Sequence, residues 1–410
     1  MLLCMCGECK KNGVSEIMEL SALENPSQAF FRSGATVFAV KREYQIVFHT
    51  IAPAMGWVEI DGKRYHDAVC GVVRSGRCLH KIKVPQSVLD RAGHYAICAA
   101  HFVERAPYFP TPGPTFRMEY DFRPIDESDG LQIAMIADSH SHTDAPTRAA
   151  EHFGDALDLL VLCGDIGNTA HDEKNSFTVY RLAENLTKGG RPVVFARGNH
   201  DTRGAFAEYL PEYMGSDDGR CYFTFRLGSL WGVVLDCGED KSDDHAEYGP
   251  IADFEAFRRV ETEFLRDVVL HKEEEYAAPG VTRRVAICHI PFTLQTASDF
   301  AGEVYREWID LLNTIGIDVM LSGHNHMIAT LSPHETLGDV KTEARFPVVI
   351  GAKSCDHPNL RNQPPVPDGK KEFTCTAIDW QESDADIKFV NSLQEIVAET
   401  RLSAISEEKV

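Results

Sequence analysis

Residues 191–201, RPVVFARGNHD, pass directly from an apolar run into a cluster of polar side chains. The run PVVFA is apolar at every position, which is typical of a strand buried on both faces of a sheet. Gly198 follows, and then three residues that can bind cations or carry protons: Asn199, His200 and Asp201. Five other apolar runs end in a polar cluster in the same way: LQIAMIAD (131–138), LDLLVLCGD (157–165), LWGVVLDCGED (230–240), RVAICHIPF (284–292) and IDVMLSGHNH (317–326).

The segments between these runs have apolar residues every three or four positions, which predicts helices. They are APTRAAEHFGDAL (145–157), SFTVYRLAENLTKGG (176–190), DFEAFRRVETEFLRDVV (253–269) and AGEVYREWIDLLNTIG (301–316). Strands that alternate with helices indicate an α/β fold, and ligands of such folds bind at the carboxyl ends of the strands. We expect three later runs (346–353, 373–380 and 385–391) to continue the core as antiparallel strands, and the acidic tail to be one helix or frayed.

The first part of the chain has a different pattern. Short clusters of β-branched and apolar residues, separated by turn signals, predict an all-β sandwich over 29–127. Asp61-Gly62 lies between two extended segments and favours a hairpin. The predicted division is therefore a polar lead (1–28), a β-sandwich (29–127), a larger α/β domain (128–392) and a C-terminal tail (393–410).

The 410 residues carry a net charge of -21, and nearly all of it lies after residue 127. An acidic protein repels polyanions, so this charge disfavours nucleic acid and anionic membranes as partners. No apolar run reaches the length of a membrane span or forms a secretory signal. The twelve cysteines are scattered, several of them inside apolar runs, which indicates reduced thiols and a cytoplasmic location. The composition does not determine an oligomeric state.

The polar clusters together contain three oxygen ligands and four imidazoles. These candidate metal ligands are Asp138, His140, Asp165, Asn199, His289, His324 and His326. A mixed nitrogen and oxygen set suits Mn, Fe or Zn rather than a thiolate site. Seven side chains are too many for one tetrahedral ion but suit two divalent ions that share a carboxylate. Such pairs of ions catalyse in-line displacement at phosphorus.

The ordered motifs D-x-H, G-D, G-N-H-D, a single H and G-H-x-H over about 131–330 resemble the calcineurin-like metallophosphoesterase superfamily. This resemblance implies a four-layer αββα sandwich, with a dinuclear centre at one edge that hydrolyses phosphoesters through a metal-bridging hydroxide. It assigns two ligand sets that share Asp165 as the bridge: Asp138, His140, Asp165 and His326 for the first metal, and Asp165, Asn199, His289 and His324 for the second. It places His200 against the substrate phosphoryl group.

Two residues depart from related patterns. Many members of the superfamily have an aspartate three residues after the bridging one, whereas this chain has Asn168, which we expect to orient His200 without supporting its charge. The domain layout resembles that of purple acid phosphatases, which have a tyrosine at this position and lack the histidine of the first motif. Because this chain has Asn168 and His140, we do not expect a tyrosinate-bound ferric ion.

Several alternatives stay open from the sequence. Arg197 and Arg203 flank the GNHD motif and either bind the substrate phosphate or form surface ion pairs. His142 could replace His140 in a shifted register. The loops 237–250 and 355–370 are long enough to wall a substrate pocket.

The acidic surroundings favour a small phosphate mono- or diester as substrate. A nuclease or a cyclic-nucleotide phosphodiesterase would carry the same motifs. In a third alternative, the β-sandwich is a protein-binding module attached to a vestigial phosphoesterase domain.

Overall fold

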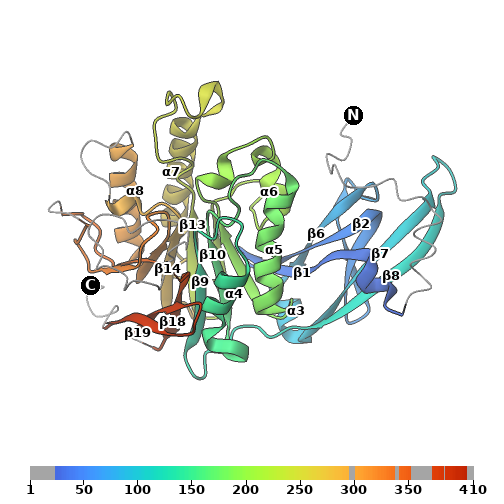
Figure 1. Ribbon diagram of the computed structural model, residues 1–410, viewed down its shortest axis with the longest axis horizontal. Helices are drawn as coiled ribbons and strands as arrows, with labels where there is room; N and C mark the ends of the chain where they lie inside the picture. Colours follow the sequence, from blue (N-terminus) through green and yellow to red (C-terminus); the bar gives the residue numbers. More distant parts are fainter. Residues whose placement is uncertain (1–23, 295–300, 338–340, 352–371, 383, 404–410) are drawn as a thin grey trace.

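The computed structural model describes residues 24–403 except 295–300, 338–340, 352–371 and 383. From residue 131 onward it contains two sheets packed face to face, with helices on both outer faces (Figure 1). In the first sheet, three neighbouring strands pair in parallel: β9 (Leu131–Ile136), β10 (Leu159–Cys163) and β11 (Pro192–Ala196). Antiparallel strands extend it beyond β9: β18 (Thr374–Trp380), β19 (Ala385–Asn391) and β20 (Ile396–Leu402).

The second sheet has a parallel centre with an antiparallel strand at each edge. The parallel strands are β13 (Leu230–Leu235), β14 (Arg283–Cys288), β15 (Val319–Ser322) and β17 (Val348–Ile350). The edges are β12 (Phe223–Leu227) and β16 (Ala329–Leu331).

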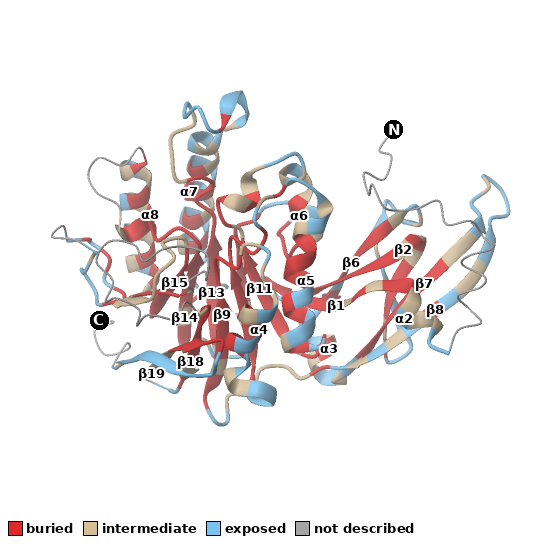
Figure 2. Ribbon diagram, in the orientation of Figure 1, coloured by how far each residue is buried: buried red, intermediate tan, exposed pale blue. Residues whose placement is uncertain are grey.

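Strand β14 contributes side chains to a different hydrophobic core on each of its two faces. Val285 and Ile287 belong to the core between the two sheets, whereas Ala286 and Cys288 belong to the core beneath the outer helices. Because successive side chains of a strand point to opposite faces, a strand buried on both sides must be apolar at every position. Figure 2 shows the central strands buried along their length. This confirms the double burial that the sequence predicts.

Helices complete the four layers. The first sheet is covered by α4 (Asp144–Ala150), the 3₁₀ helix η1 (Glu151–Ala156) and α5 (Glu173–Thr187), and the second sheet by α7 (Phe254–Leu270) and α8 (Gly302–Ile315). Shorter helical turns are η2 (His200–Thr202), η3 (Ala207–Tyr209), α6 (Leu210–Tyr213), η4 (Gly249–Ile251) and η5 (Phe292–Leu294). The fold is thus the αββα sandwich that the sequence predicts. Among the described helices, none is long and apolar enough to cross a membrane.

The N-terminal part is built mainly of strands. They are β1 (Phe31–Val40), β2 (Glu43–Ile60), β3 (Lys63–His66), β4 (Ala68–Val69), β5 (Val72–Val73), β6 (Arg77–Pro85), β7 (His94–Glu104) and β8 (Thr111–Asp121). Two short helices, α2 (Pro26–Phe30) and α3 (Gln86–Ala92), accompany them. The long strand β2 pairs with β1 and β6 through its first half and with β3 and β7 through its second half, so it belongs to both layers of the sandwich.

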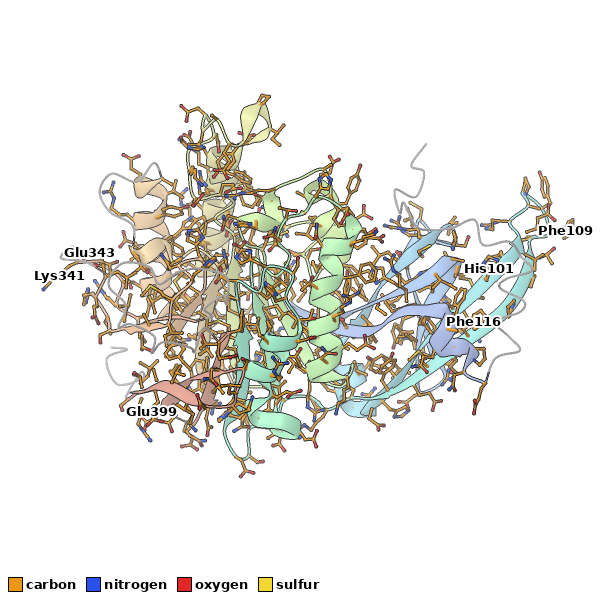
Figure 3. The ribbon with its side chains drawn as sticks, in the orientation of Figure 1. His101, Phe109, Phe116, Lys341, Glu343 and Glu399 are labelled. Carbon is orange, nitrogen blue, oxygen red and sulfur yellow. The ribbon has the colours of Figure 1, made fainter. Side chains whose placement is uncertain are left out.

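The hairpin of β7 and β8 forms the far end of this part of the molecule (Figure 3). The Phe116 ring on β8 stacks on the Phe30 ring, with centroids 4.0 Å apart, and this contact holds α2 against the sheet. Phe109, at the tip of the hairpin, is 93% exposed. The Asp61-Gly62 turn joins β2 to β3, as the sequence predicts.

Strand β1 joins the two halves of the chain. It pairs in parallel with β11, with Val37 opposite Pro192 and Phe38 opposite Val193. The N-terminal strands therefore extend the first catalytic sheet by backbone hydrogen bonds. The division at residue 127 stays a prediction about domains, because the sheet itself is continuous across it.

Three details differ from the expectations. The run at 346–353 contains β17, which pairs in parallel with β15 in the second sheet and is not an antiparallel continuation. The tail contains β20, an antiparallel strand paired with β19, where a helix or a frayed end was expected; its side chains are exposed except for the half-buried Leu402. Cys78 is disulfide-bonded, whereas the other described cysteines are free.

Candidate metal centre

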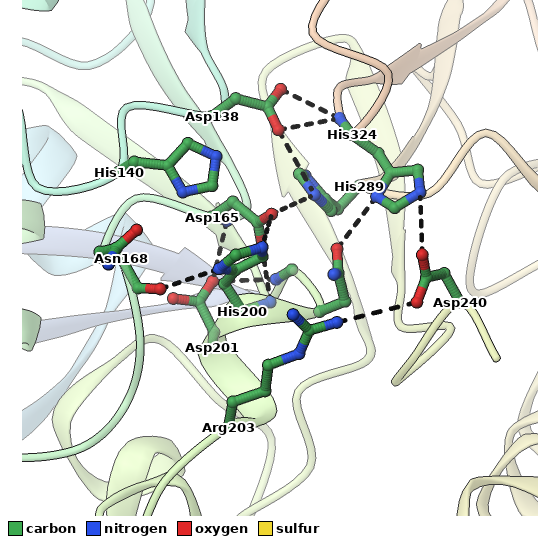
Figure 4. Close-up of polar contacts among 12 residues, drawn as sticks. Asp138, His140, Asp165, Asn168, His200, Asp201, Arg203, Asp240, His289 and His324 are labelled. Carbon is green, nitrogen blue, oxygen red and sulfur yellow. Dashed lines mark hydrogen bonds and ion pairs between the residues drawn. The ribbon is translucent and has the colours of Figure 1, made fainter. Parts of the chain in front are cut away.

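The polar clusters meet at one edge of the sandwich, where the carboxyl ends of both sheets face each other (Figure 4). Asp138 follows β9, Asp165 follows β10 and Asn199 follows β11 on the first sheet. His289 follows β14 and His324 follows β15 on the second. Parallel strands end at the same edge, and the face-to-face packing brings the two sets of ends together.

Three groups of side chains could hold a metal ion, each with ligand atoms within 4.8 Å of one another. They are Asp138, His140 and His326; His140, Asp165 and His200; and Asp165, His289 and His324. Asp165 belongs to two of these groups, and so does His140. Six of the seven predicted ligands occur in the groups, together with His200. The seventh, Asn199, has its Oδ1 3.0 Å from Nδ1 of His324.

Asp138 anchors one side of the cluster. Its carboxylate accepts hydrogen bonds from the backbone N–H of His324, and its Oδ1 lies 3.3 Å from Nε2 of His326. Nε2 of His326 in turn lies 3.0 Å from Nε2 of His140. Two imidazole nitrogens that face each other beside a buried carboxylate form a donor set that suits a cation.

His289 occupies the other side. It is 1% exposed, and its Nδ1 lies 2.7 Å from the backbone oxygen of Cys163. Because a carbonyl only accepts, Nδ1 carries the proton of this bond. The buried Nε2 lies 3.1 Å from Asp165 Oδ2 and 3.7 Å from Asp138 Oδ1. A buried nitrogen that faces two carboxylates fits a position beside a metal ion.

The backbone at the cluster is strained. Five of the seven predicted ligands have left-handed backbone: Asp138 (φ 53°), His140 (φ 43°), Asp165 (φ 52°), His324 (φ 67°) and His326 (φ 50°). Residues other than glycine rarely adopt this conformation, and such strain gathers at functional sites. The surrounding sheets therefore hold these side chains in directions that an unconstrained loop would not choose.

Two glycines allow the strand ends to approach closely. A Cβ atom on Gly198 would lie 2.2 Å from Oδ1 of Asp165, and one on Gly164 would lie 2.5 Å from the His289 ring. Gly164 also has φ +77°, which favours glycine. Any larger residue at these positions would displace a predicted ligand.

Charge is concentrated among the buried groups. Although burial disfavours a charged ring, Asp165 and Asp138 raise the pKa of His289 to about 10. Burial also opposes ionisation of Asp165, but the imidazoles of His289, His200 and His140 outweigh it and lower the pKa of this carboxyl. Two buried carboxylates surrounded by histidines make a site of negative potential that fits divalent cations.

Asp201 is a functional candidate to which the sequence assigned no role. Its Oδ2 accepts the backbone N–H groups of Asp165 and Gly198, at 3.0 and 2.9 Å, so it ties two ligand-bearing turns together. Burial and the neighbouring Asp165 carboxylate raise the pKa of Asp201 to about 7. Its place in the G-N-H-D motif was the signal that could have identified it.

His200 lies at the open side of the cluster, with its side chain 29% exposed. Its Nδ1–H donates to the backbone oxygen of Asn168 at 2.8 Å, and its Nε2 lies 4.0 Å from Asp165 Oδ2. The expectation that Asn168 orients His200 therefore fits the geometry, but the contact comes from the main chain and not from the amide side chain. The Asn168 backbone is itself held by the Ser141 hydroxyl, which accepts its N–H at 3.0 Å.

Residues 131–327 match the model of the calcineurin-like phosphoesterase family. This segment is a calcineurin-like phosphoesterase domain. No curated protein sequence matches the chain. The family match supports a metal-dependent phosphoesterase, a hydrolase that uses divalent metal ions.

Two solved structures resemble the whole arrangement. The purple acid phosphatase PPD1 from seeds of yellow lupin (Lupinus luteus) has a TM-score of 0.57 and 11% identity, over 93% of this chain and 75% of that one. A structure of PhoD has a TM-score of 0.54 and 12% identity, over 93% of this chain and 90% of that one. At these identities the likeness shows the fold, including an N-terminal β-structure ahead of the phosphoesterase domain.

Both arginines beside the GNHD motif of the phosphoesterase domain have carboxylate partners. Arg197 Nε lies 2.7 Å from Oδ2 of the buried Asp236, and its guanidinium lies over the Phe257 ring. Arg203 binds Glu239 through two hydrogen bonds of 2.6 and 2.8 Å. The structure thus places their charges in internal ion pairs and gives no contact between either guanidinium and the candidate ligands.

The remaining alternatives concern His142 and the two long loops. His142 does not occur in the metal-ligand groups found among the described residues, which include His140. The loop at 237–250 lies beside the site, since Asp240 Oδ2 is 3.8 Å from His324 Nε2. The loop at 355–370, the second predicted wall of a substrate pocket, lies outside the described residues.

Proposed function

We propose that this protein hydrolyses a small phosphate mono- or diester at a dinuclear metal centre in its phosphoesterase domain. The observation that carries the proposal is the convergence of the seven predicted ligands around Asp165, in overlapping groups. Asp138, His140, Asp165 and His326 would hold one ion, and Asp165, Asn199, His289 and His324 the other. Bound divalent ions in such sites activate water and neutralise charge that develops at phosphorus.

The protein's own residues would orient the substrate and move protons. The Asn168 carbonyl fixes the proton of His200 on Nδ1, so that Nε2 is the atom that points toward the cluster. We assign His200 to the substrate phosphoryl group, where its doubly protonated form would use the Nε2–H to stabilise negative charge or to protonate the leaving oxygen. The left-handed backbone at several of the predicted ligands is held by the surrounding sheets, which favours an electrostatically preorganised site.

Charge supports a small substrate. The chain has a net charge of -21, and both arginines nearest the site are paired with carboxylates. A nuclease needs a basic path along the nucleic-acid backbone, which this charge distribution disfavours. A small ester needs only the positive charge of the metal centre.

The first test is metal analysis of the purified protein, followed by a panel of phosphate mono- and diesters after reconstitution with Mn, Fe or Zn. We expect two metal equivalents per chain and metal-dependent turnover that is lost with a chelator. One equivalent, or none, would contradict the dinuclear assignment.

Two further outcomes would favour the alternatives. Protein that holds two metals but cleaves no ester would favour a binding module attached to a vestigial enzyme. Efficient cleavage of DNA with a steep salt dependence would favour a nuclease.

A further inference from the structure

The loop that follows β13 is fastened to the GNHD segment by Arg203. Its guanidinium forms the two hydrogen bonds to Glu239 and lies 3.2 Å from Oε1 of Glu247. The Glu239 side chain is 1% exposed, so this bidentate pair is largely shielded from water. A shielded pair with this geometry is among the stronger ionic contacts in proteins. Arg203 therefore clamps both ends of the loop 237–250.

Asp240 lies in the clamped loop and uses its two oxygens differently. Oδ1 accepts hydrogen bonds from Lys241 Nζ at 2.8 Å and from Tyr248 OH at 3.1 Å. Arg203 Nη2 lies 3.7 Å from the same oxygen. Oδ2 points the other way, toward Nε2 of His324 at 3.8 Å (Figure 4). The hydrogen bonds to Oδ1 thus keep Oδ2 of Asp240 directed toward His324.

The opposite nitrogen of His324 faces the candidate metal centre. Its Nδ1 lies 3.0 Å from Oδ1 of Asn199, and both atoms belong to the proposed second metal position. In metal sites, a ligating histidine commonly donates its other N–H to a carboxylate, which fixes the tautomer and makes the ligating nitrogen more basic. Asp240 Oδ2 faces Nε2 at the ion-pair distance of 3.8 Å, and it would accept that proton in a hydrogen bond once the two atoms move closer.

We propose that Asp240 is a positioning residue for His324 at the second metal position, and that Arg203 clamps the loop carrying it and does not bind substrate. The inference rests on the proposed function. It assigns to the loop a role in metal affinity, which the substrate-wall interpretation does not include.

The test compares three variants of the full-length protein: Asp240→Asn, Asp240→Glu and Asp244→Asn. Asp244 lies on the same loop and is exposed, so its variant is matched in charge and location. Each metal-free protein is titrated with Mn²⁺ alone by calorimetry. We expect Asp240→Asn to weaken one of two equivalents about tenfold or more, Asp240→Glu to restore much of the affinity, and Asp244→Asn to match the wild type.

Thermal unfolding of the metal-free proteins separates positioning from simple loop stability. If Asp240→Asn lowers the melting temperature but leaves both Mn²⁺ affinities unchanged, the inference is overturned. If Asp240→Asn does not fold, Tyr248→Phe removes one anchor of Oδ1 and is expected to weaken the same equivalent by a smaller factor. Unchanged affinity in that variant would also count against the inference.

Arg203→Lys tests the clamp. A clamp predicts weaker Mn²⁺ binding at the equivalent that Asp240→Asn affects, whereas a substrate contact predicts an unchanged metal affinity and a higher KM. Wild-type protein that binds no metal would overturn the proposed function and this inference together. Wild-type protein with two equivalents and an unaffected Asp240→Asn variant would overturn this inference alone.

Discussion

The N-terminal sandwich and the metal centre both contain fully buried histidines, but the surroundings of these histidines have opposite effects. His49, His80 and His289 are each 1% exposed. Burial lowers the pKa of His80 to about 3 and the pKa of His49 well below its usual value. At the metal centre, Asp165 and Asp138 raise the pKa of His289 to about 10 despite burial.

The neighbours explain this contrast. The His49 ring packs among the rings of Phe177, Tyr180 and Tyr213, so it behaves as a neutral part of the core. The ring of His289 faces two carboxylates, which favour a positive charge. His289 is thus a candidate ligand because buried carboxylates accompany it, whereas His49, which lies among aromatic rings, is a structural residue.

The largest expected effect comes from removing the charge at the centre of the cluster. Asp165→Asn keeps the shape of the side chain but removes the shared carboxylate, so we expect turnover to fall roughly 10³-fold or more. Both metal equivalents should bind more weakly, as measured by metal analysis after dialysis. Wild-type activity in this variant would contradict the dinuclear assignment.

His200→Ala distinguishes a substrate-facing histidine from a ligand. We expect a loss of about 10²–10⁴ in kcat, the range of general acid–base catalysis, with both metals retained. Kinetics and metal content measured on the same preparation give the answer. Loss of one metal equivalent would mean that His200 is a ligand, as its group with His140 and Asp165 also allows.

Because burial keeps His49 and His80 neutral in the folded protein, we expect the stability to depend on pH. Their folded pKa values lie below the unfolded value of about 6.5, so below that pH the unfolded chain binds more protons than the folded one. The free energy of unfolding should therefore fall as pH drops below about 6.5, by up to about 1.4 kcal/mol per pH unit for each histidine. Denaturant unfolding of the wild type and of His49→Gln/His80→Gln checks this. An equal slope in both proteins would contradict the neutral assignment.

The smallest effect is expected from Asn168→Ala. The contact with His200 comes from the backbone oxygen of residue 168, which alanine also has, so the substitution keeps this hydrogen bond. The side chain of Asn168 is exposed. Exposed substitutions of this kind are worth about 0.5 kcal/mol or less, about a factor of two in rate. A much larger loss of kcat would show that the amide side chain acts in the reaction.

The sequence by itself determined the features that depend on local pattern. Apolar runs predicted the buried strands, and the spacing of apolar residues predicted helices α5, α7 and α8. The polar residue types at the strand ends identified the ligand set, because parallel strands place their carboxyl ends at one edge whatever their detailed packing.

Only the tertiary structure decided the features that depend on partners distant in the chain. The pairing of β1 with β11 merges the two halves into one sheet, and strand β20 exists because β19 offers it an edge. Arg203 faces Glu239, and Asp240 faces His324, across separations that no local pattern encodes. The Asn168 carbonyl replaces a side chain that the motif led us to consider. Backbone groups are the same at every residue, so a contact made by one becomes visible only when the chain has folded.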